Sequence, residues 1–246
     1  MVRQRRRLEA QRRKRNRRLF MFWGLVGLIA VAVVAGFLGM QQGSQSEIKA
    51  PHTQEEIQKF WEEHLSTLVM KQLAGTAHPN EIVNLIIQER YRLINERYNN
   101  PRFALEGNEN YGPKDALMGA RVEPGVVAIG FMVPALMDSF HGIGADRNPA
   151  QRSVFENGLV MGYIHELDHL AYDLIESPRT LEERVTSESI TWAKTVQSME
   201  LLVSKGAFQL HPSDQKYYSV WLESKRRKDS SMWVSFIREM YRHTVP

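Results

Sequence analysis

The chain of 246 residues contains no cysteine. Disulfide bonds and thiolate metal ligands are therefore excluded, whereas the compartment stays open, because many exported domains lack disulfides. Internal repeats are absent as well. About 200 residues bury enough apolar surface for a single core without covalent cross-links, so one domain of that size is expected.

Residues 19–40 lack any charged side chain, and the residues before them carry almost no acid. A helix over these 22 residues would be ~33 Å long at ~1.5 Å per residue, which spans a hydrocarbon core of ~30 Å. Residues 1–18 hold ten basic side chains against Glu9 alone. This bias keeps the N-terminus in the cytoplasm and sends the C-terminus across the membrane. We therefore expect a basic cytoplasmic tail (1–18) and a single transmembrane helix (19–40) in the cell inner membrane.

The basic tail has two other interpretations. A nucleic-acid-binding arm is one, although topology and anionic lipid headgroups already explain the charge. A twin-arginine export signal, which residues 16–21 loosely resemble, is the other, but no small-x-small cleavage site follows the long apolar stretch. Without the tail, the 32 basic and 28 acidic residues of the chain become 22 and 27, a net charge of −5. The remaining domain therefore gives no electrostatic reason to bind nucleic acid.

Beyond a polar linker at 41–52, residues 53–246 show the pattern of an α+β, mainly helical domain. Capping boxes at Thr53 with Glu56 and at Thr180 with Glu183 predict the starts of two helices. The apolar run 126–133 predicts a strand, whereas the stretches 101–125 and 141–149 are expected to be irregular. The helices are expected over about 53–68, 80–98, 150–175, 180–205, 214–226 and 230–243.

Residues 165–169 read HELDH, inside the helix expected over 150–175. Because His165 and His169 are four residues apart, they lie on one face of a helix, and both imidazoles can bind one metal ion. Glu166 projects beside that ion, where it can take a proton from metal-bound water and pass it to a leaving amine. Two incidental histidines are the alternative. The apolar flanks predict a buried helix, in which imidazoles and a carboxylate need partners that a metal supplies.

A catalytic zinc ion takes three protein ligands and keeps one position for water. The apolar seam of the following helix has one charged member, Glu188, between Val185 and Trp192. A carboxylate on an inward face needs a compensating charge, which Zn2+ would supply. The alternatives for Glu188 are a salt bridge to an arginine, or a rotation of the helix that exposes it to solvent.

In these residues the chain resembles the gluzincins, the thermolysin-like branch of the zincin metallopeptidases, which pair HExxH with a glutamate on the following helix. Glu188 lies 19 residues after His169, at the spacing of that family. The resemblance covers residues 154–202. It implies a zincin-like domain with Zn2+ bound by His165, His169 and Glu188, and with Glu166 as the general base. It also implies that residues 126–133 form an edge strand that pairs with a peptide substrate.

Two positions depart from the gluzincin pattern. Asp168 puts a charge inside HExxH where zincins usually have none, and Trp192 replaces an aspartate that would orient His165. The segment HELDHL is also similar to the HExDH motif of peptide deformylases, but the third ligand of that family is a cysteine. The metzincin extension is absent, because Tyr172 and Ile175 stand where that family has glycine and histidine.

The sequence therefore predicts a membrane-anchored zinc metallopeptidase that cleaves protein or peptide substrates outside the cytoplasm, in a periplasm or in the extracellular space. Candidate donors to the tetrahedral oxyanion are His141, His211, Tyr217 and Tyr218. A non-enzymatic envelope component with a structural or vestigial metal site is the main alternative. Another zinc hydrolase, such as an amidase acting on cell-wall peptides, is a further one. The substrate preference and the oligomeric state stay open.

Overall fold

The computed structural model describes residues 52–108, 117–172, 180–206 and 208–242. The expected cytoplasmic tail, the transmembrane helix and the linker up to residue 51 lie outside these ranges, as does the expected helix end at 173–175. Among the helices in the described ranges, none is long and apolar enough to cross a membrane. The unit His52–Pro246 is compact by itself, and its architecture is described here.

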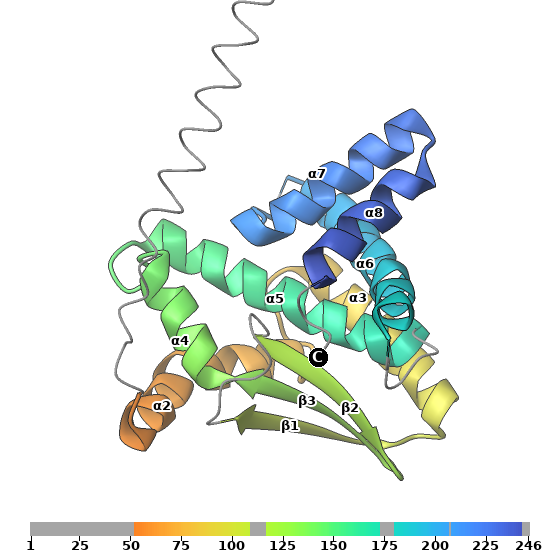
Figure 1. Ribbon diagram of the computed structural model, residues 1–246. Helices are drawn as coiled ribbons and strands as arrows, with labels where there is room; N and C mark the ends of the chain where they lie inside the picture. Colours follow the sequence, from red (N-terminus) through yellow and green to blue (C-terminus); the bar gives the residue numbers. More distant parts are fainter. Residues whose placement is uncertain (1–51, 109–116, 173–179, 207, 243–246) are drawn as a thin grey trace, which may run out of the picture. The chain divides into compact units, whose positions relative to one another are not determined.

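The described residues form a mainly helical α+β domain with one small sheet, which confirms the expected fold class at this level (Figure 1). Two π-helical segments continue the first helix. The elements in chain order are α2 (Gln54–Phe60), η1 (Trp61–Leu65), η2 (Thr67–Leu73), α3 (Glu81–Tyr98), β1 (Arg102–Asn108), β2 (Met118–Glu123), β3 (Val126–Met132), α4 (Val133–Gly142), α5 (Pro149–Tyr172), α6 (Leu181–Ser204), α7 (Pro212–Arg227) and α8 (Ser230–Tyr241).

Both predicted capping boxes are present. The Thr53 backbone N–H donates to Glu56 Oε2 at 2.8 Å, and the Glu56 N–H donates to Thr53 Oγ1 at 3.2 Å. The same exchange joins Thr180 and Glu183, at 3.2 Å in each direction. Each box satisfies two backbone donors that the first turn of a helix leaves without intrahelical partners. Helix α6 therefore begins at Leu181 as predicted, which places Glu188 two turns along it.

Strand β3 confirms the strand predicted at 126–133, but its expected position at the edge of the sheet is wrong. The strand order is β1-β3-β2, with β3 parallel to β1 and antiparallel to β2, so β3 is central. Its flanking strands come from the stretch 101–125, which was expected to be irregular. Charged and glycine residues interrupt both of these short strands, so neither shows a continuous apolar run. The charged side chains of each strand are exposed and lie on one face of it.

Helix α4 also departs from the prediction, since it covers 133–142 and so includes the start of the expected loop at 141–149. Pro134 stands in its first turn, where a missing N–H costs nothing and the fixed φ suits a helix. Pro134 is therefore a helix start signal in the sequence, directly after the apolar run that predicted the strand.

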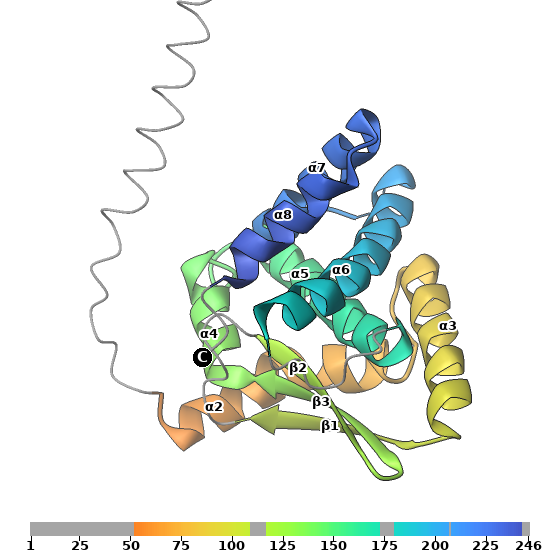
Figure 2. The same cartoon turned by 45° about the vertical axis from the view of Figure 1, so that its right-hand side comes forward.

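Helix α5 is the central element of the domain. It contacts η2, α3, α4, α6 and β2, and in both views it lies between the sheet and the group α6 to α8 (Figures 1 and 2). Gly162 leaves room for the Met118 side chain of β2, because a Cβ at that position would lie 2.4 Å from Met118 Cε. Helix α5 is therefore enclosed on several sides, which explains why its polar residues are buried. Those residues include His165, Glu166 and Asp168.

Candidate metal centre

The structure brings together the three residues that were predicted to bind metal. Helix α5 supplies His165 and His169, one turn apart, and the neighbouring α6 supplies Glu188. Glu188 Oε2 lies 3.4 Å from His165 Nε2 and 3.6 Å from His169 Nε2. One ligand atom from each residue lies within 4.8 Å of the other two, a spacing at which they could hold a single metal ion.

The two carboxylate oxygens of Glu188 have different surroundings. Oε1 forms an ion pair with Arg184, with 2.9 Å between Oε1 and Arg184 Nη2, so the salt bridge to an arginine is present. Oε2, which faces the two imidazoles, is buried and has no hydrogen-bond partner. A buried acceptor without a partner is costly, whereas a cation between Oε2 and the two Nε2 atoms would satisfy it. Two imidazoles and one carboxylate are also a ligand set typical of catalytic zinc.

The environment keeps Glu188 ionised. Burial alone would raise the pKa of this carboxyl, since its residue is only 1 % exposed. When His165 and His169 carry protons, their hydrogen bonds and charge outweigh that effect and hold the pKa of Glu188 well below its usual range. The carboxylate is therefore in the form that a metal ligand requires.

Each imidazole makes a second contact, through Nδ1, with a threonine of α6. His165 Nδ1 lies 3.2 Å from Thr195 Oγ1, and His169 Nδ1 lies 3.1 Å from Thr191 Oγ1. Both threonines are fully buried. Because Nδ1 is occupied in both rings, the Nε2 atoms are the ones directed at Glu188.

Asp168 does not point to the metal group. It is fully buried, and its Oδ1 accepts a hydrogen bond from Arg90 Nε of α3 at 2.8 Å. Its Oδ2 accepts from Thr195 Oγ1 at 2.9 Å. Burial raises the pKa of Asp168, while Arg90 and the Thr195 hydroxyl lower it. Asp168, the charged residue inside HExxH, thus forms an ion pair with Arg90 of α3. The hydroxyl of Thr195 joins it to His165.

Arg90, Thr191 and Thr195 were not among the residues predicted from the sequence. The two threonines could have been found from their spacing. Buried hydroxyl side chains recur on α6 in steps of four, four and three, beside the apolar seam that contains Glu188. These residues are Ser187, Thr191, Thr195 and Ser198. No comparable signal marks Arg90, which lies 78 residues before its partner in the chain.

Glu166 follows His165 on α5 and is 9 % exposed. It is not one of the three residues whose ligand atoms converge.

Trp192 takes a place that the gluzincin pattern gives to an aspartate, and it builds an aromatic wall. Its ring lies 4.1 Å from that of His165 between centroids, and Tyr217 of α7 stacks on it at 3.7 Å. Trp192 Nε1 donates to the Tyr241 hydroxyl at 3.0 Å. Burial, and then the charge of Glu188, raise the pKa of Tyr217 to about 12.

Of the four oxyanion candidates, Tyr217 is therefore the one that these contacts link to the metal group. His211 instead caps α7, since its Nδ1 accepts from the Ser213 N–H. His141 lies near Asp146, with 3.6 Å between His141 Nδ1 and Asp146 Oδ2. Tyr241, whose pKa is raised by burial and by the charge of Glu188, was not among the predicted residues.

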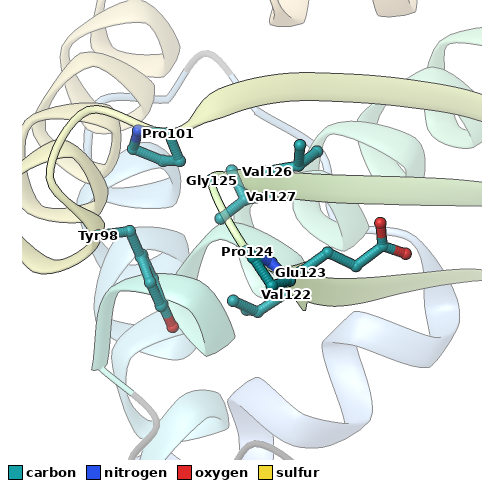
Figure 3. Close-up of a pocket in the computed structure, with 8 residues that line it drawn as sticks. All are labelled: Tyr98, Pro101, Val122, Glu123, Pro124, Gly125, Val126 and Val127. Carbon is teal, nitrogen blue, oxygen red and sulfur yellow. The ribbon is translucent and has the colours of Figure 1, made fainter.

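Two open cavities lie away from this group. One, of about 340 Å³, is lined by Tyr98, Pro101 and the turn from Val122 to Val127 (Figure 3). The other, of about 370 Å³, lies between η2, α3 and β1. Neither is lined by His165, His169 or Glu188, so they carry no argument for the metal centre.

No family model matches the chain, and no curated protein or solved structure matches it either. The class of site is therefore defined by its own geometry, as a buried His-His-Glu group on two adjacent helices.

Proposed function

We propose that the chain is a metal-dependent hydrolase, specifically a zinc metallopeptidase in which His165, His169 and Glu188 bind the ion. One observation carries the proposal, namely the buried Oε2 of Glu188, which faces two imidazole nitrogens and lacks a hydrogen-bond partner. A cation of the size and charge of Zn2+ satisfies all three atoms together.

When bound, zinc would lower the pKa of a coordinated water and polarise the carbonyl of the substrate. Glu166 is the proposed general base, which takes the proton of the attacking water and hands it to the leaving amine. The stacked rings of Trp192 and Tyr217 keep bulk water from one side of His165. Because β3 is central, the edge proposed to pair with a peptide substrate is instead that of β2, an outer strand of the sheet. Its first residue, Met118, lies against Gly162 of α5.

The proposed setting follows from the sequence alone. The basic tail at 1–18 and the uncharged stretch at 19–40 support a single-pass inner-membrane protein with the domain on the far side from the cytoplasm. The substrate would then be a protein or peptide of that compartment. The negative net charge of residues 19–246 supports no role in nucleic-acid binding.

A second candidate function is a non-catalytic component of the cell envelope with a structural metal. The burial of two of the three residues favours it, because His165 is 7 % exposed and Glu188 only 1 %, whereas the His169 side chain is 20 % exposed. Structural zinc sites are closed, whereas catalytic sites keep a position open for water. The two functions differ in whether the protein needs the Glu166 carboxylate, which only the hydrolase uses as a general base.

The test uses the full-length chain purified in mild detergent, together with the variants H169A and E166Q. We expect one Zn2+ per parent chain and per E166Q chain, but none in H169A. We also expect the parent to cleave a library of quenched fluorescent peptides, and E166Q to lose that activity by a factor of about 10² to 10⁴. A folded parent that binds no added zinc would refute the metal centre. Peptide cleavage unchanged in E166Q would refute Glu166 as the general base, and zinc binding without any cleavage by the parent would leave only the structural role.

A further inference from the structure

We infer that Asp168, acting through the hydroxyl of Thr195, locks His165 in the tautomer that leaves its Nε2 free to bind a metal. Asp168 and Thr195 are positioning residues in this scheme, since neither is among the three converging ligands. The inference deepens the proposed metal centre and depends on it for its functional meaning.

The direction of the hydrogen bonds follows from counting protons. Thr195 Oγ1 carries one proton, and three groups within reach can accept it, namely Asp168 Oδ2 at 2.9 Å, the Thr191 carbonyl at 3.1 Å and His165 Nδ1 at 3.2 Å. The carboxylate oxygen is the nearest of the three and takes the proton, so none is left for His165. The 3.2 Å contact between His165 Nδ1 and Thr195 Oγ1 must then use a proton of the imidazole. A neutral imidazole carries one N–H, so Nε2 keeps its lone pair.

The Asp168 side chain cannot reverse this arrangement while Arg90 holds it. Arg90 Nε donates to Oδ1 at 2.8 Å, and Arg90 Nη2 donates to Ser198 Oγ at 3.1 Å. The side chain of Asp168 is fully buried and that of Arg90 is 12 % exposed, so the pair is shielded from water. Because Arg90 Nε donates to Oδ1, that oxygen is an acceptor, and Oδ2 is the oxygen that faces Thr195 Oγ1.

The lock matters because a competing acceptor lies on the other side of the ring. Glu188 Oε2 has no hydrogen-bond partner and lies 3.4 Å from His165 Nε2. Without the Thr195 contact, the tautomer with a proton on Nε2 would be favoured, since that proton could bond to Oε2. That tautomer has no lone pair on Nε2 and must lose its proton before a metal can bind.

The experiment measures the tautomer directly in the metal-free, full-length chain in detergent micelles. Histidine labelled with ¹⁵N is observed about two pH units above the ordinary histidine pKa of ~6.5, so that the rings are neutral. The His165 signals are assigned by comparison with H165N. We expect the parent to carry its proton on Nδ1 of His165. A parent with its proton on Nε2 overturns the inference, whether or not any variant folds.

Three variants then separate the hydroxyl from packing. In T195V, which keeps the shape but lacks the hydroxyl, we expect the proton to move to Nε2 and Zn2+ affinity to fall by about 10- to 100-fold in competition with a chromophoric chelator. In T195S the tautomer and the affinity should stay at the parental values. S198A, a buried hydroxyl of the same helix that bonds to Arg90, should leave the tautomer of His165 unchanged.

The outcomes distinguish this inference from the proposed function. A parent that binds no zinc refutes the proposed function, while the tautomer in the metal-free protein still tests the lock. A T195V chain that keeps the proton on Nδ1, or binds zinc as tightly as the parent does, overturns the inference and leaves the metal centre intact.

Discussion

The ion pair between Arg90 and Asp168 makes a prediction about folding stability that does not depend on any metal. It joins α3 to α5 in the interior, with 2.8 Å between Arg90 Nε and Asp168 Oδ1. The perturbation is R90M, which keeps much of the side-chain volume and removes the charge. Asp168 is then left fully buried without its counter-ion.

The magnitude follows from burial. Breaking a buried pair by removing one partner costs about 3–5 kcal/mol, since the remaining charge stays desolvated. An exposed pair contributes only ~0–1 kcal/mol. The chain supplies a matched control in R238M, because Arg238 and Glu182 also form a close pair, at 2.6 Å, with side chains that are 46 % and 70 % exposed. We expect R90M to lower the free energy of unfolding by about 3–5 kcal/mol and R238M by less than about 1 kcal/mol.

The assay is chemical denaturation of the full-length variants, followed by tryptophan fluorescence, with a chelator present so that metal binding does not stabilise the folded state. A second variant, R90M with D168L, removes both charges. It should be more stable than R90M alone, because no unpaired charge remains in the interior. If R90M proved no more destabilising than R238M, or if the double variant lost more than R90M, the buried pair would not have the energetic role assigned to it.

Three further predictions concern other parts of the domain. Burial raises the pKa of Asp214 to about 7 from its ordinary 3.8, so the folded state holds that proton more tightly and stability should fall as pH rises from ~4 to ~7. In D214N, the free energy of unfolding should lack this decline of about 4 kcal/mol, as measured by urea denaturation at a series of pH values. If the parent and D214N showed parallel pH profiles, the prediction would be wrong. F131A should cost about 3–5 kcal/mol, because Phe131 is fully buried on the central strand, whereas L85A, at a side chain 64 % exposed, should cost far less in the same assay. T180A should cost about 1 kcal/mol through the lost cap of α6, measured as the denaturant midpoint, and an unchanged midpoint would argue against the capping box.

The helices of this domain were largely predictable from local chemistry. Capping at Thr53 and Thr180 marked two helix starts correctly, because a side chain that satisfies backbone N–H groups acts within one turn. The long helix with HELDH was evident from its apolar flanks. The sheet was only partly predictable. Strand β3 has no exposed residue and shows as an apolar run, whereas the outer strands β1 and β2 contain charged and glycine residues.

The candidate site was likewise only partly predictable from the sequence. Sequence alone determined that His165 and His169 share a helix face and that Glu188 lies on the buried seam of the next helix, because both follow from the helical period of 3.6 residues. Only the tertiary structure decided how α5 and α6 meet, which turned Oε2 of Glu188 toward both imidazoles and Oε1 toward Arg184. It also decided the role of Asp168, whose partners Arg90 and Thr195 lie 78 and 27 residues away in the chain. Local periodicity sets which face a residue occupies, but a buried charge is interpretable only when the packing of distant helices shows what compensates it.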